Sequence, residues 1–526
     1  MEPAENAAGA ERTSSVEVPE QAPPKAVLEA VGRHFLTICW NCPTQALYLQ
    51  RRGHSIVVHD PDRVLETDKV PITRSEQELY AYIARRGGPM DFPLILCPDE
   101  LKETAEHKRL EELCYEASVA KKIKSNTVRD RLTNLVRSAL YNLRYTPEIG
   151  HIPGDVKPFQ DLPVFLVAAG PSLDKNGALL RKCREFGPVV CVNTSVKPAA
   201  HYLKGGQIDA LVTIEALDIT EHLAGYEDRI SWAIVDTTAN PLSFEFAKKC
   251  RGRVLFSPLH ALTNKMNYCL NLPSTAYGAC VATAAHTLAV NWGAKALVAI
   301  GLDCAYADDG RMYAAHTDFE DEKWVIEGSD IFSRGRRQPY TRVKAWDGES
   351  TVIAPSDLSL FRRWFEGAAG WRDKNMPDLQ LYNCTEGGAY IDGFEHLRLA
   401  DVLKKFPRRR GSGAPAKGLA KSQTVDRALC QDLLCRIIED IDRALSKDLP
   451  HDMLMEISET PIVREYVEIQ YIPKKSEEGV TEIVDDGNGP RKHEVGSPWF
   501  DFTERVQGVL EDARDIAVDS LRVVSG

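Results

Sequence analysis

Six short runs of apolar, often branched residues recur at helix-length intervals in the middle of this 526-residue chain. The runs span residues 164–168, 189–192, 210–214, 232–235, 254–256 and 296–300. Apolar strands separated by helical crossovers form a parallel sheet that is buried on both faces. We therefore predict a doubly wound, mainly parallel α/β domain. Domains of this class bind ligands outside the carboxyl ends of their strands.

The distribution of apolar and charged residues divides the chain into five parts. Residues 1–25, rich in Ala, Glu and Pro, are predicted to be a disordered tail. Residues 26–145 indicate a small α/β region and a helical connector, and residues 146–405 a Rossmann-like catalytic domain. A basic Pro/Gly/Ser segment predicts a linker over 406–424, and helical stripes predict a mostly helical region over 425–526.

Composition limits the partners that we expect. With 65 Lys+Arg against 76 Asp+Glu, the net charge of −11 gives no electrostatic reason to expect nucleic acid. No apolar run approaches the roughly 20 residues that cross a bilayer, so no membrane span is expected. The start of the chain lacks the features of a secretory signal, and 13 scattered cysteines indicate reduced core thiols. We predict a cytoplasmic protein.

Cysteine spacing gives no sign of a metal site. Cys39 and Cys42 form the only CxxC motif, without a second pair at the spacing that zinc requires. We interpret this motif as structural.

The run at 164–168 ends in a Gly-Pro-Ser turn directly before a helix. Gly170 permits close approach of a ligand, Pro171 suits the first helical position, and free N–H groups near Ser172 favour an anion. The turn matches neither the dinucleotide-binding fingerprint nor a Walker A loop. It predicts a phosphate cradle, with a purely structural turn as the alternative.

Polar residues also follow other predicted strands. Asn193 follows the second strand and Glu215 the third, where an amide can bind a base or sugar and a carboxylate can hold hydroxyls. Helix capping is the alternative for Asn193. Further donor-site candidates in turns and glycine-rich loops are Ser274, Thr275, Gly301, Asn383, Gly387 and Gly388. For these turns a merely flexible connection is the alternative.

The loop after the run at 296–300 holds the densest set of reactive side chains. It contains Asp303, Tyr306, Tyr313 and His316, which we assign as catalytic candidates. A histidine can act as a general base near neutral pH, and tyrosyl hydroxyls can donate to a leaving phosphate. The Asp-Asp-Gly triplet at 308–310 is typical of an ordinary turn.

These motifs resemble a known domain. Residues from 164 to about 402 resemble the domain shared by bacterial motility-associated factor proteins, which are flagellin glycosyltransferases, and archaeal 6-hydroxymethylpterin diphosphokinase-like proteins. The resemblance rests on the motifs at 167–174, 301–316 and 383–389. The same domain is similar to Rossmann-like bacterial sialyltransferases, which use a CMP-activated nine-carbon sugar.

The resemblance implies an inverting glycosyltransferase that moves a CMP-activated nonulosonic, sialic-acid-like sugar to Ser or Thr of flagellin. It implies nucleotide contacts at the turn at 170–172 and at Asn193, and a phosphate clamp formed by Tyr306 and Tyr313. His316 would take the acceptor proton, and Asp303 would orient its loop. No cofactor is implied, because the CMP-sugar is a substrate.

Two alternatives stay open. A pyrophosphokinase acting on a pterin alcohol would need Mg²⁺, with Asp303, Asp308 or Asp309 as ligands. A non-enzymatic flagellar assembly factor would act through the helical C-terminal region. The arginine-rich insertion at 326–352 is either a cover for donor or acceptor, or a solvated basic hairpin.

Overall fold

The computed structural model describes residues 25–33, 36–52, 54–62, 70–85, 93–259, 261–278, 280–328, 330–333, 336–409, 416–447, 450–460, 463, 483–484, 491–492 and 498–526. The predicted tail lies outside these residues, apart from Lys25. The chain divides into two compact units between Ser125 and Asn126, within the 38-residue helix α4 (Ala105–Asn142).

The first unit is a small α/β fold around a four-stranded parallel sheet of order β3-β2-β1-β4. Its strands are β1 (Thr37–Trp40), β2 (Ile56–His59), β3 (Ile72–Thr73) and β4 (Leu94–Leu96). Its helices are α1 (Lys25–Arg33), α2 (Pro43–Arg51), α3 (Glu76–Arg85), the 3₁₀ turn Asp99–Leu101 and the first part of α4. This architecture confirms the predicted N-terminal α/β region.

Both cysteines of the CxxC motif are buried and free in this first unit. The Cys42 thiol donates to the Leu96 carbonyl across 3.1 Å. The neighbouring Cys42 and burial raise the pKa of Cys39 well above its ordinary value. The motif therefore packs inside the first unit as buried thiols, with Cys42 bound to β4.

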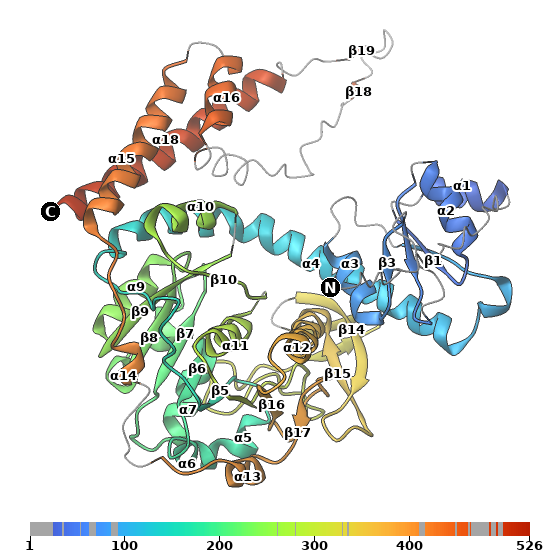
Figure 1. The fold of residues 1–526 in the computed structure, drawn as a ribbon, viewed down its shortest axis with the longest axis horizontal. Helices are drawn as coiled ribbons and strands as arrows, with labels where there is room; N and C mark the ends of the chain where they lie inside the picture. The colour runs from blue at the N-terminus through green and yellow to red at the C-terminus, as the bar shows by residue number, and fades with distance from the viewer. Residues whose placement is uncertain are drawn as a thin grey trace, which may run out of the picture. The chain divides into compact units, whose positions relative to one another are not determined.

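The second unit is built on a nine-stranded sheet of order β10-β9-β8-β7-β6-β5-β11-β16-β17 (Figure 1). Every pair in it is parallel, which confirms the doubly wound prediction. The strands are β5 (Pro163–Val167), β6 (Val189–Val192), β7 (Ala210–Thr213), β8 (Trp232–Asp236), β9 (Gly252–Pro258), β10 (Ser274–Thr275), β11 (Ala296–Ile300), β16 (Gln380–Asn383) and β17 (Glu395–His396).

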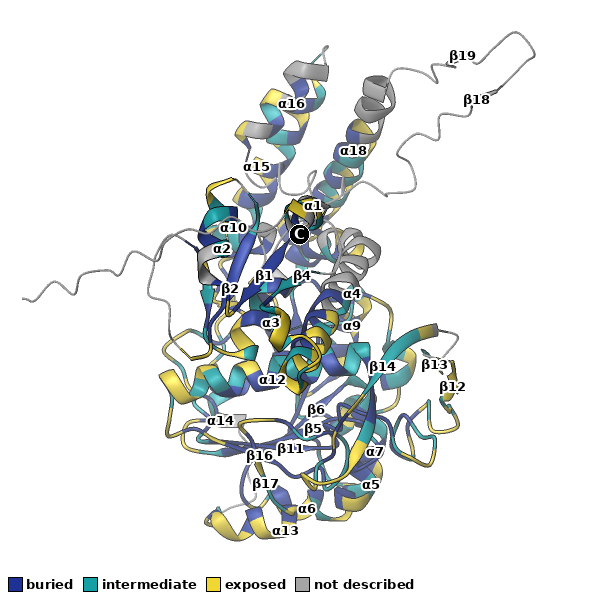
Figure 2. Cartoon of the chain, turned by 90° about the vertical axis from the view of Figure 1, so that its right-hand side faces the viewer, coloured by how far each residue is buried: buried dark blue, intermediate teal, exposed yellow. Residues whose placement is uncertain are grey.

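Helices cover both faces of this sheet. They are α5 (Leu173–Asn176), α6 (Leu180–Cys183), α7 (Val196–Tyr202), α8 (Thr220–Leu223), α9 (Pro241–Lys249), α10 (Ala261–Leu270), α11 (Val281–Asn291), α12 (Ser356–Asn375), α13 (Leu399–Val402) and α14 (Ala416–Leu419), with 3₁₀ turns at Leu143–Tyr145, Gly177–Leu179, Asn193–Ser195, Glu227–Arg229 and Leu403–Lys405. Side chains of a strand alternate between faces, so Phe165 joins one core cluster and Leu166 the other. Figure 2 shows the central strands buried.

A second, antiparallel sheet of four strands follows β11 in the chain. It consists of β12 (Val325–Glu327), β13 (Asp330–Ser333), β14 (Arg336–Lys344) and β15 (Thr351–Pro355). This is the arginine-rich insertion, which folds as more than a hairpin. Its β15 is tied to the loop after β11, because Tyr306 and Ile353 form a backbone bridge.

The C-terminal region is mostly helical, as predicted. Its helices are α15 (Arg427–Leu445), α16 (Pro450–Glu459) and α18 (Pro498–Ser525), and two short strands lie at Ile483–Val484 and Arg491–Lys492. The Asp426 carboxylate caps α15 by accepting from the Ala428 amide at 2.8 Å. Leu433 of α15 and Leu510 of α18 belong to the same core cluster as Phe165 of the sheet.

The segment expected to be a solvated linker packs against the second unit where it is described. Leu419 is fully buried, and Gln423 exchanges two backbone hydrogen bonds with His151 at 2.8 and 2.9 Å. Residues 410–415 lie outside the described part. None of the described helices has both the length and the hydropathy needed to cross a bilayer.

Candidate active site

The two loops that diverge from the middle of the nine-stranded sheet touch each other. From β5 the chain continues to β6, which lies on one side of β5. It later forms β11 on the other side of β5, so the strand order reverses here. At this switch point the Gly170 amide donates to the Gly301 carbonyl at 2.8 Å. A Cβ atom on Gly301, whose φ is +65°, would lie 2.5 Å from the Ala168 carbonyl oxygen. Only glycine fits such a close approach.

Asp303 fills the predicted phosphate cradle. One oxygen of its carboxylate accepts from the Ser172 amide at 2.9 Å, and the other accepts from the Ser172 hydroxyl. Burial raises the pKa of Asp303 to about 6, against the lowering effect of these hydrogen bonds. We predicted that Ser172 binds a phosphate. In the structure both of its donors are instead bound to Asp303. A carboxylate already takes the place of an anion at the start of α5.

The loop that carries Tyr313 lies across the end of β5. The Ala314 amide donates to the Ala169 carbonyl at 2.9 Å. Tyr313 is half-buried, with its ring 5.3 Å from that of Phe319. The structure therefore brings Tyr313 to the edge of the sheet that holds the Gly-Pro-Ser turn.

Asp174, at the start of the connection from β5 to β6, is hydrogen-bonded to the loop that carries Tyr313. Its carboxylate accepts from the Ala315 amide at 3.1 Å and from Arg311 at 2.6 Å. It also accepts from the Tyr202 hydroxyl at 3.1 Å. This contact was not predictable from the motifs, because Asp174 and Arg311 are 137 residues apart.

Asn193 lies at the end of β6, next to β5. The Ser195 hydroxyl accepts from the Val192 amide at 3.1 Å and donates to the Val167 carbonyl at 2.7 Å. Ser195 therefore stabilises this turn, which was the alternative role considered for Asn193. The Asn193 Oδ1 atom is buried and has no hydrogen-bond partner in the described part of the chain. Such an atom costs about 1–3 kcal/mol unless a ligand or water satisfies it.

Tyr306 packs in the small core of the antiparallel sheet. It is 9% exposed, and its hydroxyl lies 3.2 Å from the Ser333 hydroxyl of that sheet. Its ring stacks 6.2 Å from Trp324, and the partly buried Tyr313 packs against the same cluster. The two tyrosines of the predicted phosphate clamp therefore share one cluster, and the Tyr306 hydroxyl faces Ser333.

His316 is exposed and lies against α7. Its ring stacks on His201 with the ring centres 3.7 Å apart. Its φ of +66° is unusual for a residue with a Cβ atom, and its amide donates to Glu320 at 2.5 Å. The structure pairs the predicted base with a second imidazole that the sequence motifs did not indicate.

The loop after β16 closes one side of the switch point. Asn383 is fully buried, and its Oδ1 accepts from the Thr385 hydroxyl at 2.7 Å, while its amide nitrogen lies 3.1 Å from His396. Both polar groups of the Asn383 side chain therefore contact other residues of the protein. These contacts do not support its predicted role in binding the nucleotide-sugar donor. The Ala389 amide, next to Gly388, donates to the Asp303 carbonyl at 2.7 Å.

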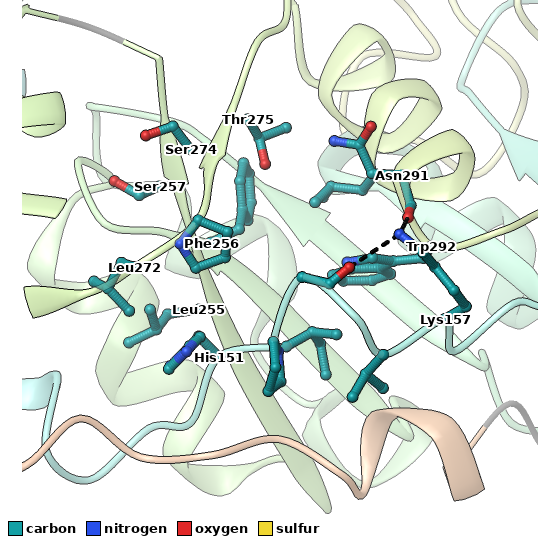
Figure 3. A pocket seen from close by; sticks show the side chains of 16 residues that line it. His151, Lys157, Leu255, Phe256, Ser257, Leu272, Ser274, Thr275, Asn291 and Trp292 are labelled. Carbon is teal, nitrogen blue, oxygen red and sulfur yellow. Dashed lines mark hydrogen bonds between the residues drawn. The ribbon is translucent and has the colours of Figure 1, made fainter. Parts of the chain in front are cut away.

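The remaining candidates lie at different distances from the switch point. Gly387 is beside Ser172, because a Cβ atom on it would lie 3.3 Å from the Ser172 Cβ. Glu215 follows β7 and accepts from the nearby Leu217 amide at 3.4 Å. Ser274 and Thr275 form β10, with four strands between them and β5. They line a separate cavity of about 190 Å³ (Figure 3).

A further carboxylate with an altered pKa lies at the end of β8. Asp236 is fully buried and accepts from the Tyr277 hydroxyl at 2.5 Å and the Thr238 hydroxyl at 2.7 Å. Burial raises the pKa of Asp236 to about 6, against these hydrogen bonds. The hydrogen bond between Tyr277 and Asp236 joins the segment before α11 to the end of β8. Neither residue was predicted as a site residue.

The fold defines an α/β protein with a Rossmann-like central sheet, and the candidate site lies at its switch point. Residues 135–309 match the family of 6-hydroxymethylpterin diphosphokinase MptE-like proteins. Over these residues the chain is similar to the MptE-like family, in agreement with the resemblance inferred from the motifs at 167–174 and from the start of the motif at 301–316. The matched segment includes Ser172, Asn193 and Asp303, and it ends before Tyr313.

Two other comparisons complete the picture. No curated protein matches the chain. The solved structure of a MAf glycosyltransferase from Magnetospirillum magneticum is similar with a TM-score of 0.48 and 15% sequence identity, covering 93% of this chain and 78% of that chain. A similarity of this degree assigns no activity.

Proposed function

We propose that the chain is a glycosyltransferase that transfers a CMP-activated nonulosonic sugar to Ser or Thr of flagellin or another protein. The motif resemblance and the MptE-like domain support this proposal. The observation that carries it is that the loops of Asn193 and Tyr313 are both hydrogen-bonded to the end of β5, through Ser195 to the Val167 carbonyl and through Ala314 to the Ala169 carbonyl.

Each group at this edge has a chemical role in the proposal. Asn193 Oδ1, which lacks a partner in the described chain, accepts a hydrogen bond from the nucleotide. The Tyr313 hydroxyl donates to the phosphate of the departing CMP. His316 removes the proton of the acceptor hydroxyl as its oxygen bonds to the anomeric carbon and the bond to CMP breaks. Asp303 holds the Gly-Pro-Ser turn through Ser172.

Magnesium-dependent pyrophosphoryl transfer is the second candidate, because the matching family is named for a pterin diphosphokinase. The contacts of two of its expected ligands favour glycosyl transfer. Asp303 is buried against Ser172, and Asp309 pairs with Arg311 at 2.8 Å. A metal would have to break these contacts to gain both carboxylates.

Release of CMP tests the proposal. Purified protein, a CMP-nonulosonic sugar and flagellin should release CMP, and Tyr313→Phe and His316→Ala should each lower the rate by about 10²–10³. Tyr306→Phe is the matched control and should keep the rate, because the Tyr306 hydroxyl lies 3.2 Å from the Ser333 hydroxyl of the antiparallel sheet. Full activity in both test variants would overturn the mechanism. Mg²⁺-dependent AMP formation from ATP and a pterin alcohol would favour the second candidate.

A further inference from the structure

A second cavity lies at the far edge of the nine-stranded sheet. It opens between β9, β10, the end of α11 and the segment that starts at His151. Three strands separate β9 from β5, so this cavity is distinct from the switch-point edge. Its volume is about 190 Å³. An apolar cavity of about 150 Å³ already holds benzene, so a ligand whose body is a single ring has room here.

The interior of this cavity is apolar. Leu288 of α11 and Trp292, which caps that helix, lie one turn apart, and the Trp292 amide donates to the Leu288 carbonyl at 2.9 Å. Residues at this spacing share one face of a helix. Both are buried, and an edge contact with Phe159, with the ring centres 5.4 Å apart, holds the indole. Leu272, just before β10, adds a further buried apolar side chain to the lining.

The rim of the cavity carries a cation. Lys157 is exposed, and its ammonium donates to the Gly154 carbonyl at 3.1 Å and to the Asn291 carbonyl at 2.8 Å (Figure 3). Asn291 is the last residue of α11, so these bonds have the form of a helix C-cap. Capping occupies two of the three N–H groups of the ammonium and leaves one for a ligand.

No described carboxylate balances this charge. Both partners of the Lys157 ammonium are neutral carbonyls, and no Asp or Glu is among the described residues that line the cavity. The Asn291 carbonyl belongs to the peptide bond that leads into Trp292. The cation therefore lies at the end of the cavity that the indole lines, and a group bound to it is one ring's length from the apolar walls.

A positive rim over an apolar interior matches an anion with an apolar body. A carboxylate at the exposed Lys157 keeps part of its hydration, so it avoids the large cost of a fully buried ion. One cation with one remaining N–H group matches a single negative charge. A dianion such as a phosphate monoester would keep its second charge without a partner.

We propose that this cavity binds a small monocarboxylate whose body is a single apolar ring. The carboxylate accepts a hydrogen bond from the Lys157 ammonium at the rim, and the ring packs against Leu288 and Trp292 inside. The proposal is independent of the glycosyl-transfer proposal, because it uses other residues and another edge of the sheet.

Three probes separate the contributions of charge and ring. Benzoate has both, benzamide has the same shape without the charge, and acetate has the charge without the ring. In NMR titrations of the full chain, benzoate should bind about fivefold more tightly than benzamide, the value of an ion pair at an exposed site. It should bind about tenfold more tightly than acetate, because the ring leaves water. Benzoate binding that equals that of either other probe would overturn the proposal.

A charge variant locates the carboxylate. In Lys157→Met, benzoate should bind only as tightly as benzamide, whose own affinity should not change. A structural loss at the helix end would instead weaken both probes alike. Lys157→Arg keeps the cation and should keep the preference for benzoate. Lys374→Met is the matched control, because Lys374 is exposed on α12 and is not in the lining. An unchanged preference in a folded Lys157→Met variant would contradict the proposal.

A filling variant locates the ring. Leu272→Trp places a larger side chain in the lining, so it should weaken benzoate and benzamide by the same factor. Leu272→Met has nearly the volume of the native residue and should bind both probes as before. Circular dichroism checks that both variants are folded. Unchanged binding in a folded Leu272→Trp variant would place the ring outside the cavity and contradict the proposal.

Discussion

Asp303 holds both polar groups of Ser172, the amide and the hydroxyl, across the switch point between β5 and β11. An alanine at 303 would remove the acceptor of both donors. We expect Asp303→Ala to lower the free energy of unfolding by about 1–3 kcal/mol, the cost of leaving a buried donor unpaired. Urea denaturation measures this change. Asp308→Ala, at an exposed site in the same loop, should change stability by less than about 0.5 kcal/mol. Equal stabilities would contradict the clamp.

The Asp174–Arg311 contact should matter more for activity than for stability. The two side chains are 22% and 33% exposed, so their ion pair is worth at most about 1 kcal/mol. Asp174→Ala releases both Arg311 and the Ala315 amide, and with them the loop of Tyr313. On the glycosyl-transfer proposal, CMP release should fall at least tenfold in this variant, and hydrogen exchange at Ala315 should become faster. Unchanged exchange at Ala315 would show that the loop is held by other contacts.

Removing Asn193 should separate ligand binding from folding. The Asn193→Ala variant loses a buried oxygen that has no partner in the described chain, so its melting temperature should stay the same or rise. Its affinity for CMP should fall about tenfold if this oxygen accepts from the nucleotide. Ser195→Ala is the contrasting variant, because it loses two hydrogen bonds and should melt lower. A lower melting temperature in Asn193→Ala alone would assign Asn193 a structural role.

His286 should make the fold sensitive to acid. It is 6% exposed between Trp364 and Phe365, and neither ring nitrogen has a hydrogen-bond partner among the described residues. Burial lowers the pKa of His286 from 6.5 to about 4. The unfolded chain therefore binds the proton first, and stability should fall by up to about 3 kcal/mol as the pH drops from about 6.5 to 4. In His286→Phe this part of the loss should disappear. Parallel stability curves for the two proteins would contradict the prediction.

The strands of the sheet were predictable because each carries its own signal. Two of the predicted runs, 189–192 and 296–300, coincide with β6 and β11. The short strands β10 and β17 were not predictable, because two residues have no period and their pairing depends on β9 and β16.

The motifs predicted at which edge of the sheet the candidate site lies, but not which of its residues contact one another. The motifs placed Ser172, Asn193 and Tyr313 at carboxyl ends of strands, which is where the structure has them. They could not show that Asp303 would take both donors of Ser172, 131 residues away in the chain. Nor could they show that Tyr306 would be drawn into a core made by residues 331–353, since that core exists only after the antiparallel sheet forms.

Because α15 and α18 share a core with the sheet, removing them should destabilise the domain that holds the candidate site. A fragment ending near residue 405 would expose the apolar side chains that now face Leu433 and Leu510, and it would lose the strand-like pairing of Gln423 with His151. Such a fragment should aggregate. The C-terminal helices are thus part of the same folded body as the nine-stranded sheet.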